Sequence, residues 1–194
     1  MVTRAPRAPR VIDEVAPGYE ILGNEDMLQD EAALKNVLSA DEIARRKQRR
    51  SLGRITGRFN NDSRMDFAAL VVNRSIKDEG PDRQGHFAAR LVVCLGAKAP
   101  QKYRCEILPT LKGNFISLPY WADLELFKIN GEIKCGTPGE TIRAYYPKGW
   151  KGKRPGSGEK DLPALKLRPN HDAIGEYAIG SNLGRTLVRR ANGV

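Results

Sequence analysis

Cys94 and Cys105 are the two residues whose spacing most directly predicts a covalent bond. They flank a segment that contains Gly96 and Pro100, and they lie symmetrically about its centre. Because residues at equal distances from a hairpin turn face each other, we predict a disulfide across a hairpin. Such a bond stabilises a fold by about 3 kcal/mol and is typical of oxidising compartments. The alternative is a pair of reduced core cysteines in a cytosolic protein.

Cys135 is the third cysteine and lies in a glycine-rich turn. With the other two paired, it is predicted to be a free thiol or one half of a bond whose partner lies beyond Val194.

The other residues with reactive side chains form no catalytic set. Zinc needs three or four ligands at compatible spacing, whereas this chain has two histidines, His86 and His171, and no Cys-x-x-Cys. His171 precedes Asp172 at the start of a predicted strand, where a surface histidine is the simpler interpretation. No Gly-Lys-Ser/Thr follows a strand to bind phosphate. We therefore predict a protein that is not an enzyme and needs no cofactor.

One segment is similar to a calcium loop. Asn60, Asp62 and Asp66 stand at the third, fifth and ninth places of such a loop, directly before an apolar strand. The first place should hold an acid but holds Arg58. The sequence therefore disfavours calcium, and we predict that Arg58 bridges Asp62 and Asp66 in place of the ion.

The net charge of +10, from 33 Lys and Arg against 23 Asp and Glu, favours nucleic acid, an acidic membrane surface or an acidic protein as partner. One cluster of cations ends a predicted helix: Arg45, Arg46, Lys47, Arg49 and Arg50. It is either a nucleic-acid patch or a solvated helix end in which cations meet the helix dipole.

A second cluster lies in the glycine-rich segment 147–163, which we predict to be a flexible basic loop. An aromatic anchor is ringed by cations there: Lys148, Trp150, Lys151, Lys153 and Arg154. Trp and Arg often dominate binding energy, so these residues are the predicted partner-binding site. The alternative is an idle insertion, because the glycines make ordering costly.

The predicted elements define an α+β fold. Residues 1–16 are predicted to be a flexible basic tail, residues 25–38 a first helix or pair of helical turns, and residues 39–48 a helix opened by a Ser39–Glu42 capping box. Short strands follow at 55–59, 67–72, 87–95, 103–108, 123–129, 141–146, 165–167, 172–179 and 186–190. We predict one domain over 17–194, with N-terminal helices packed on a mainly antiparallel β-sheet.

Several short motifs together carry a family resemblance. They are Pro17 to Leu22, Gly57 to Ala69, the paired-cysteine segment, Cys135 to Glu140, Asp172 to Ile174, and Gly180 with Ser181. In this order they resemble a group of small exported bacterial proteins marked by an Asp-x-Asn-x-Asp segment before a strand. Some members are similar to immunity proteins that block secreted antibacterial effectors, including those of type VI secretion.

The resemblance implies a periplasmic protein whose leader is not part of this sequence. It also implies a function, the neutralisation of a secreted effector or toxin by binding. The residues leave a second hypothesis open, a basic nucleic-acid-binding module that uses Arg45 to Arg50 and Lys148 to Arg154.

Overall fold

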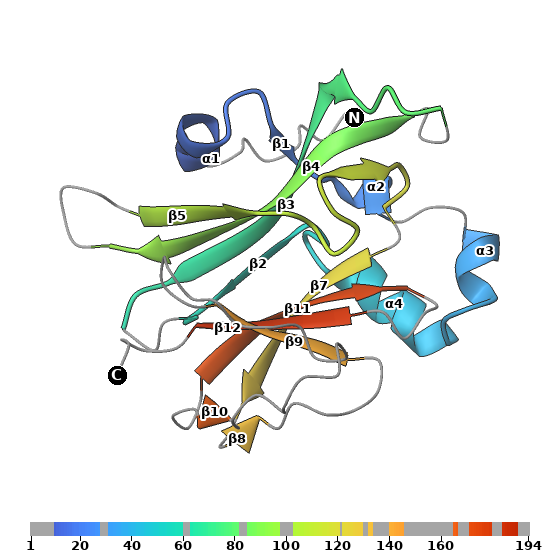
Figure 1. Cartoon of the computed structure of the whole chain (residues 1–194). Coiled ribbons are helices and arrows are strands. Elements are labelled where there is room, and N and C mark those ends of the chain that lie inside the picture. The colour runs from blue at the N-terminus through green and yellow to red at the C-terminus, as the bar shows by residue number, and fades with distance from the viewer. Residues whose placement is uncertain are drawn as a thin grey trace, which may run out of the picture.

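Two β-sheets make up most of the computed structural model (Figure 1). The described residues are 10–27, 31–59, 63–81, 85–97, 103–120, 122–129, 132–133, 140–145, 165–166, 171–179 and 184–189. Within them the chain is mainly antiparallel sheet with a few short helices. At this level the predicted fold class is confirmed.

The N-terminal sheet has the strand order β1-β3-β4-β5, with β2 pairing β3 and β6 pairing β4. All its pairs are antiparallel. Its strands are β1 (Glu20–Ile21), β2 (Arg54–Gly57), β3 (Asp66–Lys77), β4 (His86–Gly96), β5 (Tyr103–Leu108) and β6 (Phe115–Ser117).

The C-terminal sheet has the order β7-β11-β12-β9. Its pairs are antiparallel except for β12 with β9, which run parallel. Its strands are β7 (Ala122–Ile129), β9 (Glu140–Tyr145), β11 (His171–Ala178) and β12 (Gly184–Arg189). A further two-stranded ladder joins β8 (Glu132–Ile133) to β10 (Leu165–Lys166).

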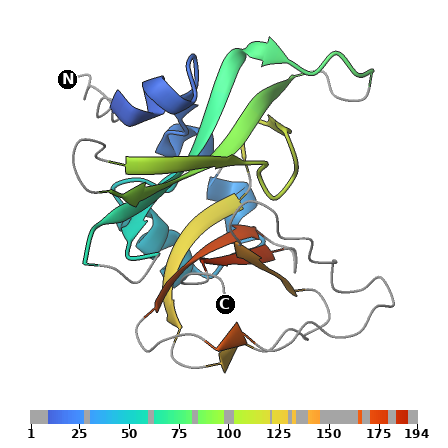
Figure 2. The same ribbon diagram turned by 60° about the vertical axis from the view of Figure 1, so that its left-hand side comes forward.

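The central strand β3 is buried on both faces from Asp66 to Asn73, which explains the apolar run from Phe67 to Val72, and its last four residues are exposed. Phe67 and Val71 belong to a cluster that includes Ile12 of the N-terminal helix. Leu70, on the opposite face, belongs to a cluster that includes Leu124 of the C-terminal sheet. Both views place α1 and the C-terminal sheet on opposite sides of the N-terminal sheet (Figures 1 and 2).

The first helix corrects the prediction of a flexible tail over residues 1–16. From Arg10 onward the chain forms α1 (Arg10–Val15), and Ile12 and Ala16 are buried. Val11 and Val15 also pack against their cluster, so this segment has an apolar face that the preceding Arg-Ala-Pro repeat lacks. Residues 1–9 lie outside the described structure.

The other predicted helices are confirmed. Residues 25–38 contain two short ones, α2 (Asn24–Met27) and α3 (Glu31–Lys35), and α4 (Ala40–Gln48) follows. Ser39 is the N-cap of α4 in a full capping box, with its Oγ accepting from the Glu42 amide at 3.3 Å. The Glu42 carboxylate accepts from the Ser39 amide at 2.8 Å. None of the described helices is long and apolar enough to span a membrane.

The predicted strands are present within a few residues of their expected bounds. The short strands β1, β6 and β8 were not predicted, because two or three residues are too few to show a period. The single domain over 17–194 stays a prediction.

Candidate functional site

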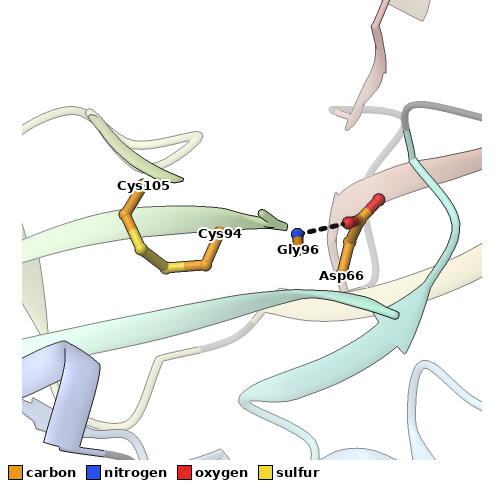
Figure 3. The surroundings of a disulfide bond; sticks show 4 residues. All are labelled: Asp66, Cys94, Gly96 and Cys105. Atoms are coloured by element: carbon orange, nitrogen blue, oxygen red, sulfur yellow. Dashed lines mark hydrogen bonds between the residues drawn. A yellow bond between two sulfur atoms is a disulfide. The ribbon is translucent and has the colours of Figure 1, made fainter. Parts of the chain in front are cut away.

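The predicted disulfide is confirmed. Cys94 of β4 and Cys105 of β5 are direct register partners, with their Cα atoms 4.0 Å apart and their sulfurs bonded (Figure 3). Cys94 is fully buried, and its cluster includes Phe67 and Tyr103. The bond therefore ties β5, the last strand in the sheet order, to the sheet interior. Cys135 lies outside the described residues.

A buried carboxylate lies beside this bond, on the residue that precedes Phe67, the register partner of Cys94. Asp66, the first residue of β3, is only 1% exposed. Its Oδ1 accepts from the main-chain amide of Gly96 at 2.8 Å, and its Oδ2 accepts from the amide of Phe59 at 2.7 Å. Figure 3 shows the first of these bonds at the end of β4. Asp66 thus holds the entry of the 58–66 loop and the end of β4 together.

Asp172 of β11, in the C-terminal sheet, is a second buried carboxylate that binds a main-chain amide. It is 6% exposed, and its Oδ2 accepts from the main-chain amide of Arg58 at 2.7 Å. Its other oxygen, Oδ1, is buried and makes no hydrogen bond in the structure as described. Two carboxylates from two sheets therefore bind the successive amides of Arg58 and Phe59.

Gly57 makes this arrangement sterically feasible. It is the register partner of Asp66, and a Cβ placed on it would lie 2.7 Å from Leu126 Cδ1 and 3.1 Å from Asp172 Oδ2. Contacts under 3.0 Å essentially never occur for real Cβ atoms. The absence of a side chain at Gly57 thus lets the two sheets approach each other.

The calcium-like positions are only partly described. Asn60 and Asp62 lie outside the described residues, so the predicted bridge from Arg58 to Asp62 and Asp66 stays a prediction. The Arg58 side chain is exposed, and the described contribution of this residue is its amide bond to Asp172. Among the residues that the structure places, no three His, Cys, Asp or Glu side chains gather as a metal-binding group.

The basic cluster at the end of α4 is divided between surface and interior. Arg45, Lys47 and Arg50 are exposed. Arg46 is buried, and the Arg49 guanidinium donates to the main-chain carbonyl of Leu124 in β7. Only part of the cluster is therefore presented to a nucleic acid.

The predicted partner-binding residues cannot be placed. Lys148, Trp150, Lys151, Lys153 and Arg154 all lie outside the described residues. Sequence reasoning, in turn, missed Asp172 and Glu176 as structural carboxylates. The available signal was a charged residue inside an apolar strand, since such residues are seldom buried without a partner.

Comparisons with known proteins assign no family to this chain. A scan against protein-family models and searches of curated proteins and of solved structures found no match to this chain.

Proposed function

We propose that this chain is a non-enzymatic binding protein of the bacterial periplasm, an immunity protein that neutralises a secreted antibacterial effector by binding to it. The resemblance to small exported proteins is part of this proposal. In it the N-terminal helices form a layer packed on the sheet domain, and the 147–163 loop contributes Lys148, Trp150, Lys151, Lys153 and Arg154 to the contact with the effector.

The Cys94–Cys105 disulfide is the observation that carries the proposal. Disulfides persist in oxidising compartments such as the periplasm and are rare in the cytosol. This one lies within the main sheet and shares a cluster with core side chains, as expected of a bond on which the fold depends.

The charge supports a protein partner with an acidic surface. A net charge of +10 accelerates encounter with an acidic surface and disfavours basic partners. The proposed activity needs no calcium, because Arg58 replaces the first acidic ligand and adds a like charge to the ion.

A protection experiment tests the proposal. The chain is exported to the periplasm of cells that also receive the effector encoded by a neighbouring gene, and survival is compared with that of cells expressing the chain in the cytosol. We expect protection and co-purification only with the exported form. Binding to DNA or RNA that weakens steeply with salt, with no protection, would favour a nucleic-acid-binding module instead.

A further inference from the structure

A set of exposed side chains surrounds the Asp66 anchor at one end of the N-terminal sheet. Met65 is 54% exposed and Leu126 is 41% exposed. Arg58 and Arg104 are also exposed, and Arg64 is half-buried. We call these five residues the basic end surface.

The contacts around Asp66 bring these residues to the same end of the sheet. A Cβ on Gly96 would lie 2.7 Å from the Arg64 Cβ and 3.0 Å from the Met65 carbonyl oxygen. Arg104 is paired with Leu95, the residue before Gly96. On the other side, Gly57 links Asp66 to Leu126.

The exposed charge here is mainly positive. Asp66 and Asp172 are buried, and each accepts from main-chain amides. The surface contains three arginines, and one exposed acid, Glu106, stands two positions after Arg104 in β5. Asp62 is the remaining acid of the 58–66 loop. The surface is therefore complementary to negative charge.

The apolar side chains distinguish a protein from a nucleic acid as its occupant. Phosphate contacts need cations and hydrogen-bond donors, whereas Met65 and Leu126 offer neither. Exposed Met among Arg is instead typical of protein interfaces, where an apolar centre is surrounded by a polar rim.

The anchors also hold main-chain groups beside the surface in place before binding. Asp66 fixes both the Phe59 and the Gly96 amides, and the disulfide fixes β5, which includes Arg104. A preorganised surface loses less conformational entropy on association.

We propose that the basic end surface is the contact face for an acidic segment of a partner protein, one that presents an apolar side chain between carboxylates. This inference rests on the proposed binding function and adds a second contact surface to the 147–163 loop named there. Arg58 and Arg104 pair with the carboxylates of the partner, while Met65 and Leu126 receive the apolar side chain.

Calorimetry with two probes tests the inference: the effector from the neighbouring gene, and a synthetic peptide of alternating Glu and Leu. The test variant is Arg58→Glu with Arg104→Glu, and a second variant is Met65→Ser. Arg45→Glu with Arg50→Glu is the matched control, because it reverses two exposed arginines on and just after α4. Far-UV circular dichroism checks that each variant is folded.

We expect the test variant to weaken binding of both probes by at least about tenfold and the control to change it by less than about twofold. Met65→Ser should also weaken binding, without altering its salt dependence. Equal losses of binding affinity in the test and control variants would overturn the assignment of this surface.

The outcomes separate this inference from the proposed function. If the wild-type protein binds the effector and the test variant binds it equally well, the proposed surface is refuted and the immunity function is not. If the wild-type protein does not bind the effector but binds the peptide, and the test variant loses peptide binding, the immunity function is refuted and the surface is supported. Loss of DNA binding rather than peptide binding in the test variant would overturn the assignment of a protein partner.

Discussion

The Tyr120 hydroxyl donates a hydrogen bond of 2.7 Å to Oε1 of Glu176, and both side chains are buried. The same oxygen accepts from the main-chain amide of Leu111 at 2.8 Å. Glu176 therefore fastens the segment before β7 to the middle of β11. A buried carboxylate of this kind is tolerable only while its hydrogen bonds are made, because desolvation of a charge is costly.

Tyr120→Phe should lower the free energy of unfolding by about 1–3 kcal/mol, since it removes one donor from a buried carboxylate. Urea denaturation measures this loss. Tyr19→Phe is the control and should cost less than about 0.5 kcal/mol, because no hydrogen bond of its hydroxyl is described. Equal costs in the two variants would show that the Glu176 bond is not stabilising.

Cys94→Ala with Cys105→Ala should lower stability by about 3 kcal/mol, because the bond closes a short loop in the unfolded chain. The sequence separation of the two cysteines is 11. Mass spectrometry after non-reducing alkylation should find both thiols protected in protein from the periplasm. Full labelling of both thiols there would remove the main support for an exported protein.

Gly57→Ala should destabilise the fold by about 1–3 kcal/mol, because the added methyl group overlaps Leu126 and Phe59. Leu126→Ala in the same chain should recover part of this loss by opening space. Thermal unfolding of the single and double variants gives the coupling between the two positions. Strictly additive effects would mean that the sheets do not meet at Gly57.

Asp66→Asn should lower the free energy of unfolding by about 1–3 kcal/mol. The side-chain amide nitrogen then faces one of the two main-chain amides from which the carboxylate accepts. The same substitution should weaken binding at the basic end surface. Asp13→Asn on α1 is an exposed control that should leave both quantities unchanged. If Asp66→Asn changes neither the stability nor the binding, the carboxylate is not the anchor.

The capping box makes a prediction about pH. Hydrogen bonds from Ser39 lower the pKa of Glu42 below its ordinary value. A carboxyl whose pKa is lower in the folded state adds stability above its unfolded pKa and loses it as the pH falls through the folded pKa. Nuclear magnetic resonance titration should show the Glu42 pKa returning towards the ordinary value in Ser39→Ala. An unchanged pKa would mean that Ser39 does not cause the shift.

Local patterns were predictable from the sequence, and contacts between distant segments were not. The Ser39–Glu42 capping box and the placement of Cys94 and Cys105 about one turn each lie within a short stretch of chain, and both are present. The Asp172 bond to Arg58 joins residues 114 positions apart, so no spacing rule indicates it. Burial of Ile12 likewise depends on β3.

The position of β12 in the sheet order determines when the C-terminal sheet can form during synthesis. β12 lies between β11 and β9, so the C-terminal sheet cannot close before residues 184–189 have left the ribosome. Leu124 and Ile174 of that sheet share a core cluster with Leu70 of the first. The face of the N-terminal sheet that carries Leu70 therefore stays uncovered until the C-terminal sheet has formed, and a partly folded chain of this kind exposes apolar side chains.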